Sequence, residues 1–213
     1  MKPGSKYLNE AQRKWVQQWW RALQPREPEE APLPPELACL KRGDRAELRR
    51  CSNTDELLGK SATFLLADRL IALDGEKGWL KDTPRTYEYL ALIAGVLAGI
   101  KEDRRDGLSL SHHLGSLPGR ERPVMSELRF KRLQRSKDSA DLYRQWQRAV
   151  QLAGGKADVA QLAADLFAWL HELGQSPLHA SDSVKFRWAY DYYLSARERV
   201  AATDPMTDKE ANA

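Results

Sequence analysis

Residue types that favour β-strands are scarce in this chain, and residue types that favour helices dominate it. Its 213 residues include 7 Val, 3 Ile and 6 Thr against 30 Leu and 26 Ala. Leu and Ala are strong helix formers, whereas β-branched residues are enriched in strands. No run of alternating apolar and polar residues has the pattern of a half-buried strand. The sequence therefore predicts an all-α fold.

The prolines indicate where helices cannot run. Five of the eleven lie within 25–35, whereas 36–83, 124–176 and 178–204 contain none. Proline removes a backbone donor and clashes with the preceding helical turn, so the long proline-free stretches are where we expect helices. The acidic, proline-rich segment 25–35 is expected to be a surface connector.

Capping residues and hydrophobic spacing place the individual helices. Asn9 can cap a first helix, with Gln12 at capping-box spacing. Thr83-Pro84 begins a helix whose surface is apolar on all sides, which predicts a central buried helix. Another short helix is expected at 45–51, with Asp44 as its N-terminal cap after a break at Gly43. The predicted helices are approximately 9–24, 36–41, 45–51, 54–73, 83–101, 110–114, 125–136, 139–153, 158–172 and 183–201.

We expect these helices to form a compact two-lobed bundle of about eight to ten helices. The N-terminal lobe covers 1–117 and includes the connector at 25–35, and the C-terminal lobe covers 118–202. The tail, 203–213, is expected to be frayed because it has few apolar residues with which to pack.

Composition and motifs exclude several classes of function. The longest apolar run, Tyr89 to Ile100, is too short to span a bilayer, and residues 1–20 lack the apolar core of a signal peptide. Cys39 and Cys51 have neither a second cysteine pair nor a histidine at zinc spacing. The sequence contains no Gly-x-Ser-x-Gly, P-loop or Gly-x-Gly-x-x-Gly motif. We expect a cytoplasmic, non-enzymatic protein with no metal, cofactor or membrane partner.

The histidines do not alter this expectation. His112 and His113 are adjacent, and neighbouring residues on a helix point about 100° apart, so the two cannot jointly bind one metal ion. We expect both on the surface or in a loop. His171 and His179 stand alone in the sequence and are expected to be structural.

The positive charge is concentrated in one part of the chain. The net charge is only +4. The segment 120–148 alone holds nine basic residues against four acidic ones, a local balance of +5. The remainder of the chain is therefore slightly acidic, and the basic segment becomes the candidate binding surface.

Within the predicted helix 125–136, the basic residues recur at spacings that share one broad face. They are Arg129, Lys131, Arg132 and Arg135. Leu128 and Leu133 are left for the buried side, and Arg144 and Arg148 lie one turn apart on the next helix. Acidic partners at a spacing of four residues are not expected along these stripes.

A second basic cluster lies in the N-terminal half. Its members are Lys41, Arg42, Arg45, Arg49 and Arg50. Arg outnumbers Lys in both clusters, and the planar guanidinium suits bidentate contacts to phosphate. The sequence favours a helical protein that binds nucleic-acid backbone without reading sequence, or an assembly subunit that does so.

Aromatic residues are dense near the C-terminus. They are Phe186, Trp188, Tyr190, Tyr192 and Tyr193. A base-stacking platform is one interpretation. Core packing or a protein interface is favoured, because Trp188, Tyr192 and Val184 fall on one helix face.

An ordered set of short motifs runs from about Trp19 to Leu194. It comprises Trp19-Trp20-Arg-Ala-Leu, Leu40-Lys-Arg-Gly-Asp-Arg-Ala-Glu-Leu-Arg-Arg-Cys, Asp55-Glu-Leu, Thr83-Pro84-Arg85, Gly107-Leu-Ser-Leu, Glu127-Leu-Arg-Phe-Lys-Arg-Leu-Gln-Arg and Ala140-Asp-Leu. No motif is diagnostic alone, but the ordered set is much more specific than its parts. In this set the chain resembles the CasB family, the small subunit of the type I-E CRISPR surveillance complex Cascade.

The resemblance implies a non-catalytic, all-helical subunit of an antiviral complex. In that family two copies lie head to tail, contact the large and backbone subunits, and support the guide RNA–target DNA hybrid and the displaced strand of the R-loop. Carried over by motif, its basic positions fall on Arg50, Arg85, Arg129 and Arg135. The departures are the insertion at 25–35, the acidic-ended tail, and His112-His113 where the family has a basic residue.

Charge patterning and the resemblance together give one set of expected nucleic-acid-binding residues. They are Arg45, Arg49, Arg50, Arg85, Arg129, Lys131, Arg132, Arg135, Arg144 and Arg148. The expected partners are guide RNA, target DNA, the other Cascade subunits and a second copy of the chain. A helical adaptor that places its arginine stripes on acidic protein surfaces is the alternative. A free-standing transcription regulator would need a helix-turn-helix, and we identify no convincing one.

Overall fold

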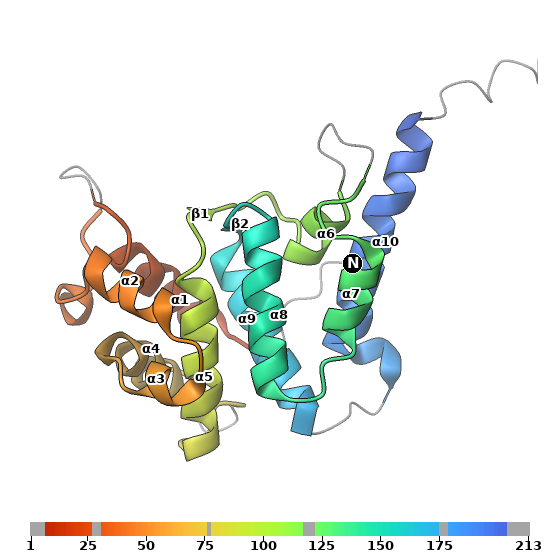
Figure 1. The fold of residues 1–213 in the computed structure, drawn as a ribbon. Coiled ribbons are helices and arrows are strands. Elements are labelled where there is room, and N and C mark those ends of the chain that lie inside the picture. Colours follow the sequence, from red (N-terminus) through yellow and green to blue (C-terminus); the bar gives the residue numbers. More distant parts are fainter. Residues whose placement is uncertain (1–6, 27–30, 76–77, 117–121, 175–178, 204–213) are drawn as a thin grey trace, which may run out of the picture.

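The computed structural model describes residues 7–26, 31–75, 78–116, 122–174 and 179–203, with side chains to Ser195. In this part of the chain it forms an all-α fold, as the sequence predicts (Figure 1). The helices are α1 (Glu10–Ala22), α2 (Arg42–Arg50), α3 (Thr54–Leu58), α4 (Ser61–Ala72), α5 (Pro84–Leu97), α6 (Leu110–Gly115), α7 (Glu127–Gln134), α8 (Ser139–Leu152), α9 (Val159–Gly174) and α10 (Val184–Thr203). Short 3-10 helices cover Pro35–Leu37 and Ala180–Asp182.

Two of the capping residues read from the sequence, Asn9 and Thr83, do begin their helices. The Asn9 side chain accepts the backbone N–H of Gln12 at 2.9 Å, and the Gln12 side chain accepts that of Asn9 at 2.8 Å. Gln12 is itself buried and donates to the carbonyl of Leu70 at 3.0 Å, so the cap also joins α1 to α4. Thr83 caps α5, and Pro84 is its first residue.

Three predicted helix assignments are wrong. Gly43 does not break a helix, because α2 begins at Arg42 and the Asp44 carboxylate accepts the N–H of Lys41 at 2.7 Å from within its first turn. The predicted helix 54–73 is divided into α3 and α4 at Gly59 and Lys60. The predicted helix 36–41 is instead the 3-10 turn at Pro35–Leu37.

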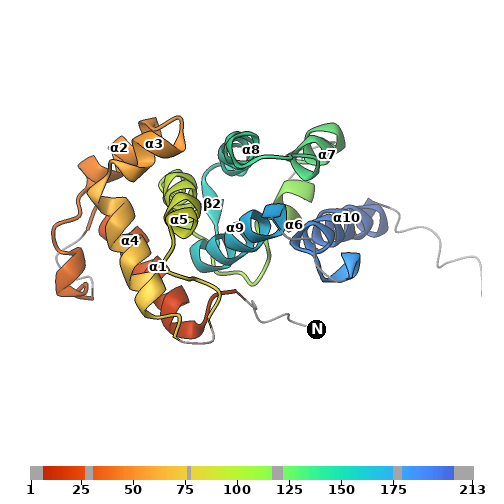
Figure 2. The ribbon, with the colours of Figure 1, turned by 90° about the horizontal axis from the view of Figure 1, so that it is seen from below.

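Helix α5 is the buried centre of the fold, as its apolar surface predicts. It contacts α2, α3, α4, α8 and α9, and Figure 2 shows it between α3 and α8. Gly95 permits this close packing, since a methyl group there would lie 2.5 Å from the hydroxyl oxygen of Tyr143 and 2.9 Å from a methyl of Leu57. That Tyr143 hydroxyl donates to the carbonyl of Cys51 at 3.1 Å and so joins α8 to the end of α2.

The only strands among the described residues are a two-residue parallel pair that the sequence does not predict. Strand β1 (Glu102–Asp103) pairs with β2 (Lys156–Ala157). Strand β2 follows the turn at Gly154 and Gly155, both of which have a positive φ that favours glycine. It connects the segment after α5 to the segment after α8.

The predicted division into two lobes stays a prediction, because its boundary falls in 117–121, outside the described residues. Core residues on both sides of that segment belong to one hydrophobic cluster. Helix α6 packs against α10, and α1 and α5 pack against α9. Residues 27–30 of the expected connector and 204–213 of the expected tail also lie outside the described residues. Within the described part of the chain, no helix combines the length and apolar character needed to cross a membrane.

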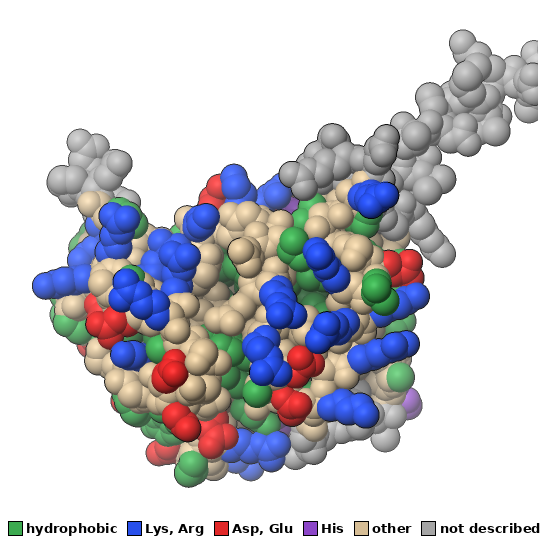
Figure 3. All heavy atoms as spheres, viewed as in Figure 1, with side chains coloured by type: hydrophobic (Ala, Val, Ile, Leu, Met, Phe, Trp, Pro, Cys, Tyr) green, Lys and Arg blue, Asp and Glu red, His purple; other side chains and the backbone are tan. Residues whose placement is uncertain are grey.

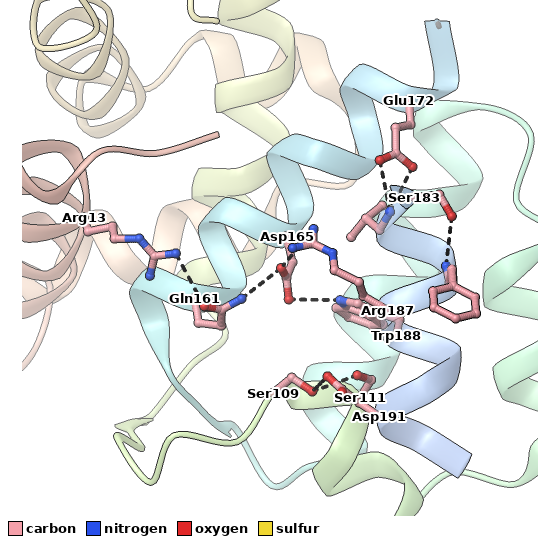
Figure 4. Close-up of polar contacts among 12 residues, drawn as sticks. Arg13, Ser109, Ser111, Gln161, Asp165, Glu172, Ser183, Arg187, Trp188 and Asp191 are labelled. Carbon is pink, nitrogen blue, oxygen red and sulfur yellow. Dashed lines mark hydrogen bonds and ion pairs between the residues drawn. The ribbon is translucent and has the colours of Figure 1, made fainter. Parts of the chain in front are cut away.

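A buried carboxylate connects α9 to α10 (Figure 4). Asp165 accepts hydrogen bonds from the Gln161 amide and the Trp188 indole, both at 3.0 Å. Arg187 lies 3.9 Å from it, at the outer limit of an ion pair. Burial raises the pKa of Asp165 to about 6, because the interior favours the neutral acid. Nearby, Glu172 accepts the N–H of Val184 at 3.0 Å, at the start of α10.

We expect Asp165→Asn to remove a pH dependence of stability. The pKa of Asp165 is about 6 in the folded chain against 3.8 for an ordinary Asp, so the folded state binds the proton more tightly. Its contribution to stability is therefore complete below pH ~3 and is lost as pH rises through ~6. Relative to the parent chain, the Asn variant should gain about 2 kcal/mol between pH 4 and pH 7.5. Urea denaturation at both pH values measures this, and an unchanged difference would contradict it.

Candidate nucleic-acid interface

Helix α7 packs through one side and leaves its cations on the other. Phe130 and Leu133 are buried, and the Phe130 ring stacks on that of Tyr192 in α10 with centroids 4.1 Å apart. Leu128 is 80% exposed, so its predicted place on the buried side is wrong. It lies about 160° around the helix from Phe130, and the aromatic contact with α10 fixes which side faces inward.

The charges on α7 are mostly unpaired. The Lys131 ammonium lies 2.7 Å from the Glu127 carboxylate, four residues earlier. This hydrogen-bonded pair raises the pKa of Lys131 and lowers that of Glu127, and it corrects the expectation that no such acidic partner exists. Arg129, Arg132 and Arg135 are exposed, and their guanidinium groups make no hydrogen bond or ion pair with another described residue.

Helix α8 adds two cations next to those of α7. It buries Leu142, Tyr143 and Trp146 and exposes Arg144 and Arg148. Arg144 lies 3.8 Å from the Asp141 carboxylate, a weak pair on an exposed surface. Arg148 has no such partner among the described residues.

The two helices are held side by side by the segment that joins them. The Ser136 hydroxyl, after α7, donates to the Asp141 carboxylate of α8 at 2.8 Å. Figure 3 shows Lys and Arg side chains gathered over α7 and α8 on one face of the molecule. We call this surface the α7–α8 basic face, and its members are Arg129, Lys131, Arg132, Arg135, Arg144 and Arg148.

The second cluster divides into one structural arginine, Arg45, and four exposed cations, Lys41, Arg42, Arg49 and Arg50. The Arg45 guanidinium donates to the carbonyls of Ala98 at 3.0 Å and Ile100 at 2.8 Å, at the end of α5. Burial, followed by the charges of Arg49 and Arg42, lowers its pKa. Arg49 and Arg50 are exposed, and their guanidinium groups have no hydrogen bond or ion pair with another described residue. Figure 3 shows cations over α2 on the same view as the α7–α8 basic face.

Arg85 lies far from the second basic cluster, which we call the α2 cluster. It lies at the start of α5, whereas Arg45 contacts the far end, and the 14 residues of α5 span about 21 Å. Its guanidinium donates to the Tyr89 hydroxyl at 2.7 Å and lies 5.4 Å from the centre of that ring. A role for Arg85 in binding nucleic acid stays a prediction.

The described residues contain no group of three His, Cys, Asp or Glu side chains that could hold a metal ion.

His113 is not at the surface, where the sequence analysis placed it. It is buried on α6, with its Nε2 atom 3.1 Å from the Asp106 carboxylate. Burial is the main reason that its pKa is lowered. His113 therefore faces an acidic partner within the fold and not the solvent.

The chain is similar to known proteins over most of its length. The family described as CRISPR-associated protein Cse2 matches residues 44–193. A chain in the crystal structure of E. coli Cascade bound to a PAM-containing dsDNA target is 22% identical, with 84% of this chain and 95% of that one covered and a TM-score of 0.54. CasB from Thermus thermophilus is also 22% identical, with 91% and 99% covered and a TM-score of 0.52. No curated protein matches the chain.

The contacts of Arg45 predict a stability effect that its neighbour Arg49 does not share. Arg45→Ala removes donors from two carbonyls at the end of α5 and should lower the free energy of unfolding by about 1–3 kcal/mol. Arg49→Ala removes an exposed cation from the same helix and should change it by less than about 0.5 kcal/mol. Chemical denaturation of both variants measures the difference. Equal effects would show that the Arg45 contacts contribute nothing specific.

Proposed function

The chain belongs to the CRISPR-associated protein Cse2 family, and from this premise we propose that it is a non-catalytic subunit of an RNA-guided Cascade complex. In this proposal the α7–α8 basic face holds nucleic-acid backbone. The exposed, unpaired arginines on that face are the observation that supports it. The proposed partners are the guide RNA–target DNA hybrid, the displaced strand, the large and backbone subunits of the complex, and a second copy of the chain.

Unpaired arginines matter because a cation already held in an ion pair must give up that pair to bind phosphate. Arg129, Arg132, Arg135 and Arg148 have no such pair with a described residue. Each planar guanidinium can donate two parallel hydrogen bonds to one phosphate. Lys131 and Arg144 pair with acidic neighbours, and the charge of Arg132 also helps to lower the pKa of Asp141, so we assign these three smaller contributions.

The geometry suits a partner whose sequence does not have to be read. Base pairing between guide and target supplies sequence specificity in RNA-guided complexes, which leaves the protein to hold backbone by charge and shape. Exchange of a DNA duplex for an RNA–DNA hybrid is nearly balanced in free energy. A few phosphate contacts, each contributing about 1 kcal/mol, are enough to shift that balance.

The α2 cluster has a narrower role in this proposal. Arg49 and Arg50 are exposed on α2, and Figure 3 shows cations over α2 on the same face of the molecule as those over α7 and α8. Arg45 instead positions α2 on α5 through its two carbonyl contacts. We therefore propose Arg49 and Arg50 as backbone contacts and Arg45 as a positioning residue.

The full-length chain should bind a single-stranded DNA 30-mer with a strong dependence on salt. Arg129→Ala with Arg135→Ala should weaken binding by about tenfold or more and reduce the slope of log affinity against log salt by about 1.4. Fluorescence anisotropy at several salt concentrations measures both. An unchanged slope would contradict the assignment of these arginines.

Matched charge removal elsewhere is the control. Lys14 and Lys81 are exposed cations outside α7 and α8, so Lys14→Ala with Lys81→Ala removes the same charge. If the two double variants weaken binding equally, net charge and not the α7–α8 basic face explains the affinity. Binding of acidic proteins in place of nucleic acid would favour the adaptor function.

A further inference from the structure

Helix α10 presents a row of exposed aromatic rings. Phe186, Tyr190 and Tyr193 are 50%, 58% and 39% exposed. Their spacing of four and three residues places them on one face of the helix. The opposite face buries Val184, Trp188, Tyr192 and Ser195, as the sequence predicts for the first three. We call the exposed row the α10 aromatic strip.

The strip is neither an isolated ring nor part of the core. The rings of Phe186 and Tyr190 have centroids 6.4 Å apart and are inclined by 31°, so they form adjoining exposed surfaces. Tyr193 is held in place because its hydroxyl donates to Glu127 at 3.0 Å and its ring lies edge-on to Phe130. From Phe186 to Tyr193 the helix rises about 10 Å, the length of about three stacked nucleotides.

The strip borders the cations of α7. The Gln134 amide of α7 donates to the carbonyl of Lys185 in α10 at 3.2 Å, so the end of α7 lies beside the start of α10. At the other end of α7, Glu127 accepts from Tyr193 and pairs with Lys131. At this end the exposed row therefore meets a cation of α7 through Tyr193, Glu127 and Lys131. The two helices lie next to each other in Figures 1 and 2.

We propose that the α10 aromatic strip stacks on the bases of a single-stranded nucleic-acid segment whose phosphates are held by the arginines of α7. The inference rests on the proposed function and extends it from backbone to bases. Single-strand-binding surfaces combine a cationic track with aromatic side chains, since every base has a π-face and stacking tolerates any sequence. The charge of α7 favours a polyanion over an apolar protein partner at this position.

The same chemistry selects single strands over duplexes. Bases within a duplex are already stacked on one another and expose only their edges, so the strip gains contact only from unpaired nucleotides. The α7–α8 basic face alone would bind either form through phosphate. In this proposal the α10 aromatic strip gives the chain a preference for an unpaired strand over a duplex.

The test compares two probes of equal charge on the full-length chain. One is a labelled single-stranded dT 30-mer, and the other is an abasic oligonucleotide of the same length. The variants are Phe186→Ala with Tyr190→Ala, and Phe64→Ala as the control. Phe64 is an exposed aromatic residue of similar exposure, 43%, on α4, which Figure 2 shows on the opposite side of α5 from α8.

The parent chain should bind dT more tightly than the abasic probe. The Phe186/Tyr190 double variant should lose about fivefold or more in dT affinity, keep its abasic affinity, and retain the salt slope of the parent chain. Phe64→Ala should change none of these. Circular dichroism melting checks that both variants stay folded.

Each other outcome overturns a distinct proposal. If the parent chain binds both probes equally, or the double variant keeps its dT affinity, the strip does not stack on bases, and a protein interface becomes the better assignment. If the parent chain binds neither probe at low salt, the phosphate-binding function and the stacking inference both fail. If the aromatic variant loses salt dependence and abasic binding, its effect acts through the α7–α8 basic face and the stacking assignment is wrong.

Discussion

The rest of the structure depends on the burial of α5 among the helices that surround it. Residues from Leu90 to Leu97 are all buried, and α2, α3, α4, α8 and α9 each contact the helix. Gly95 lets α8 and α3 approach closely, and Arg45 binds the two carbonyls at its end. The packing of α8 against α5 fixes the position of α8. The hydrogen bond from Ser136 to Asp141 then links the end of α7 to α8. The position of the α7–α8 basic face is therefore set by a core that contains none of its arginines.

A folded surface of like charges is stable here because each exposed arginine is placed opposite a well-packed side of its helix. Phe130 and Leu133 fix α7, and Trp146 and Tyr143 fix α8. Mutual repulsion on an exposed surface is screened by salt and is small beside the burial of such side chains. A phosphate backbone removes that repulsion, so its binding gains from charges whose arrangement has already been established by folding. The aromatic residues of α10 follow the same principle, with Trp188 and Tyr192 inward and Phe186 and Tyr190 outward.

The sequence predicts those features that depend on local chemistry. The caps at Asn9 and Thr83, the buried α5 and the all-α class follow from residue type and spacing, and the family resemblance read from ordered motifs is confirmed by the family match. Features decided by tertiary contact were missed: the inward side of α7, the burial of His113, the β1–β2 pair and the division at Gly59. Arg45 shows the limit most clearly, since its spacing from Arg49 resembles a surface stripe while its partners, Ala98 and Ile100, lie more than fifty residues away.

The central claim is that the α7–α8 basic face acts on nucleic acid within an assembled complex. The most direct measurement is R-loop yield on a matched target DNA by a reconstituted complex at physiological salt, with the parent chain or with Arg129→Ala, Arg132→Ala and Arg135→Ala combined. The account predicts that the variant subunit assembles normally and that R-loop yield falls, with the difference in target affinity between parent and variant narrowing as salt is raised. Normal assembly with unchanged R-loop yield at every salt concentration would contradict it.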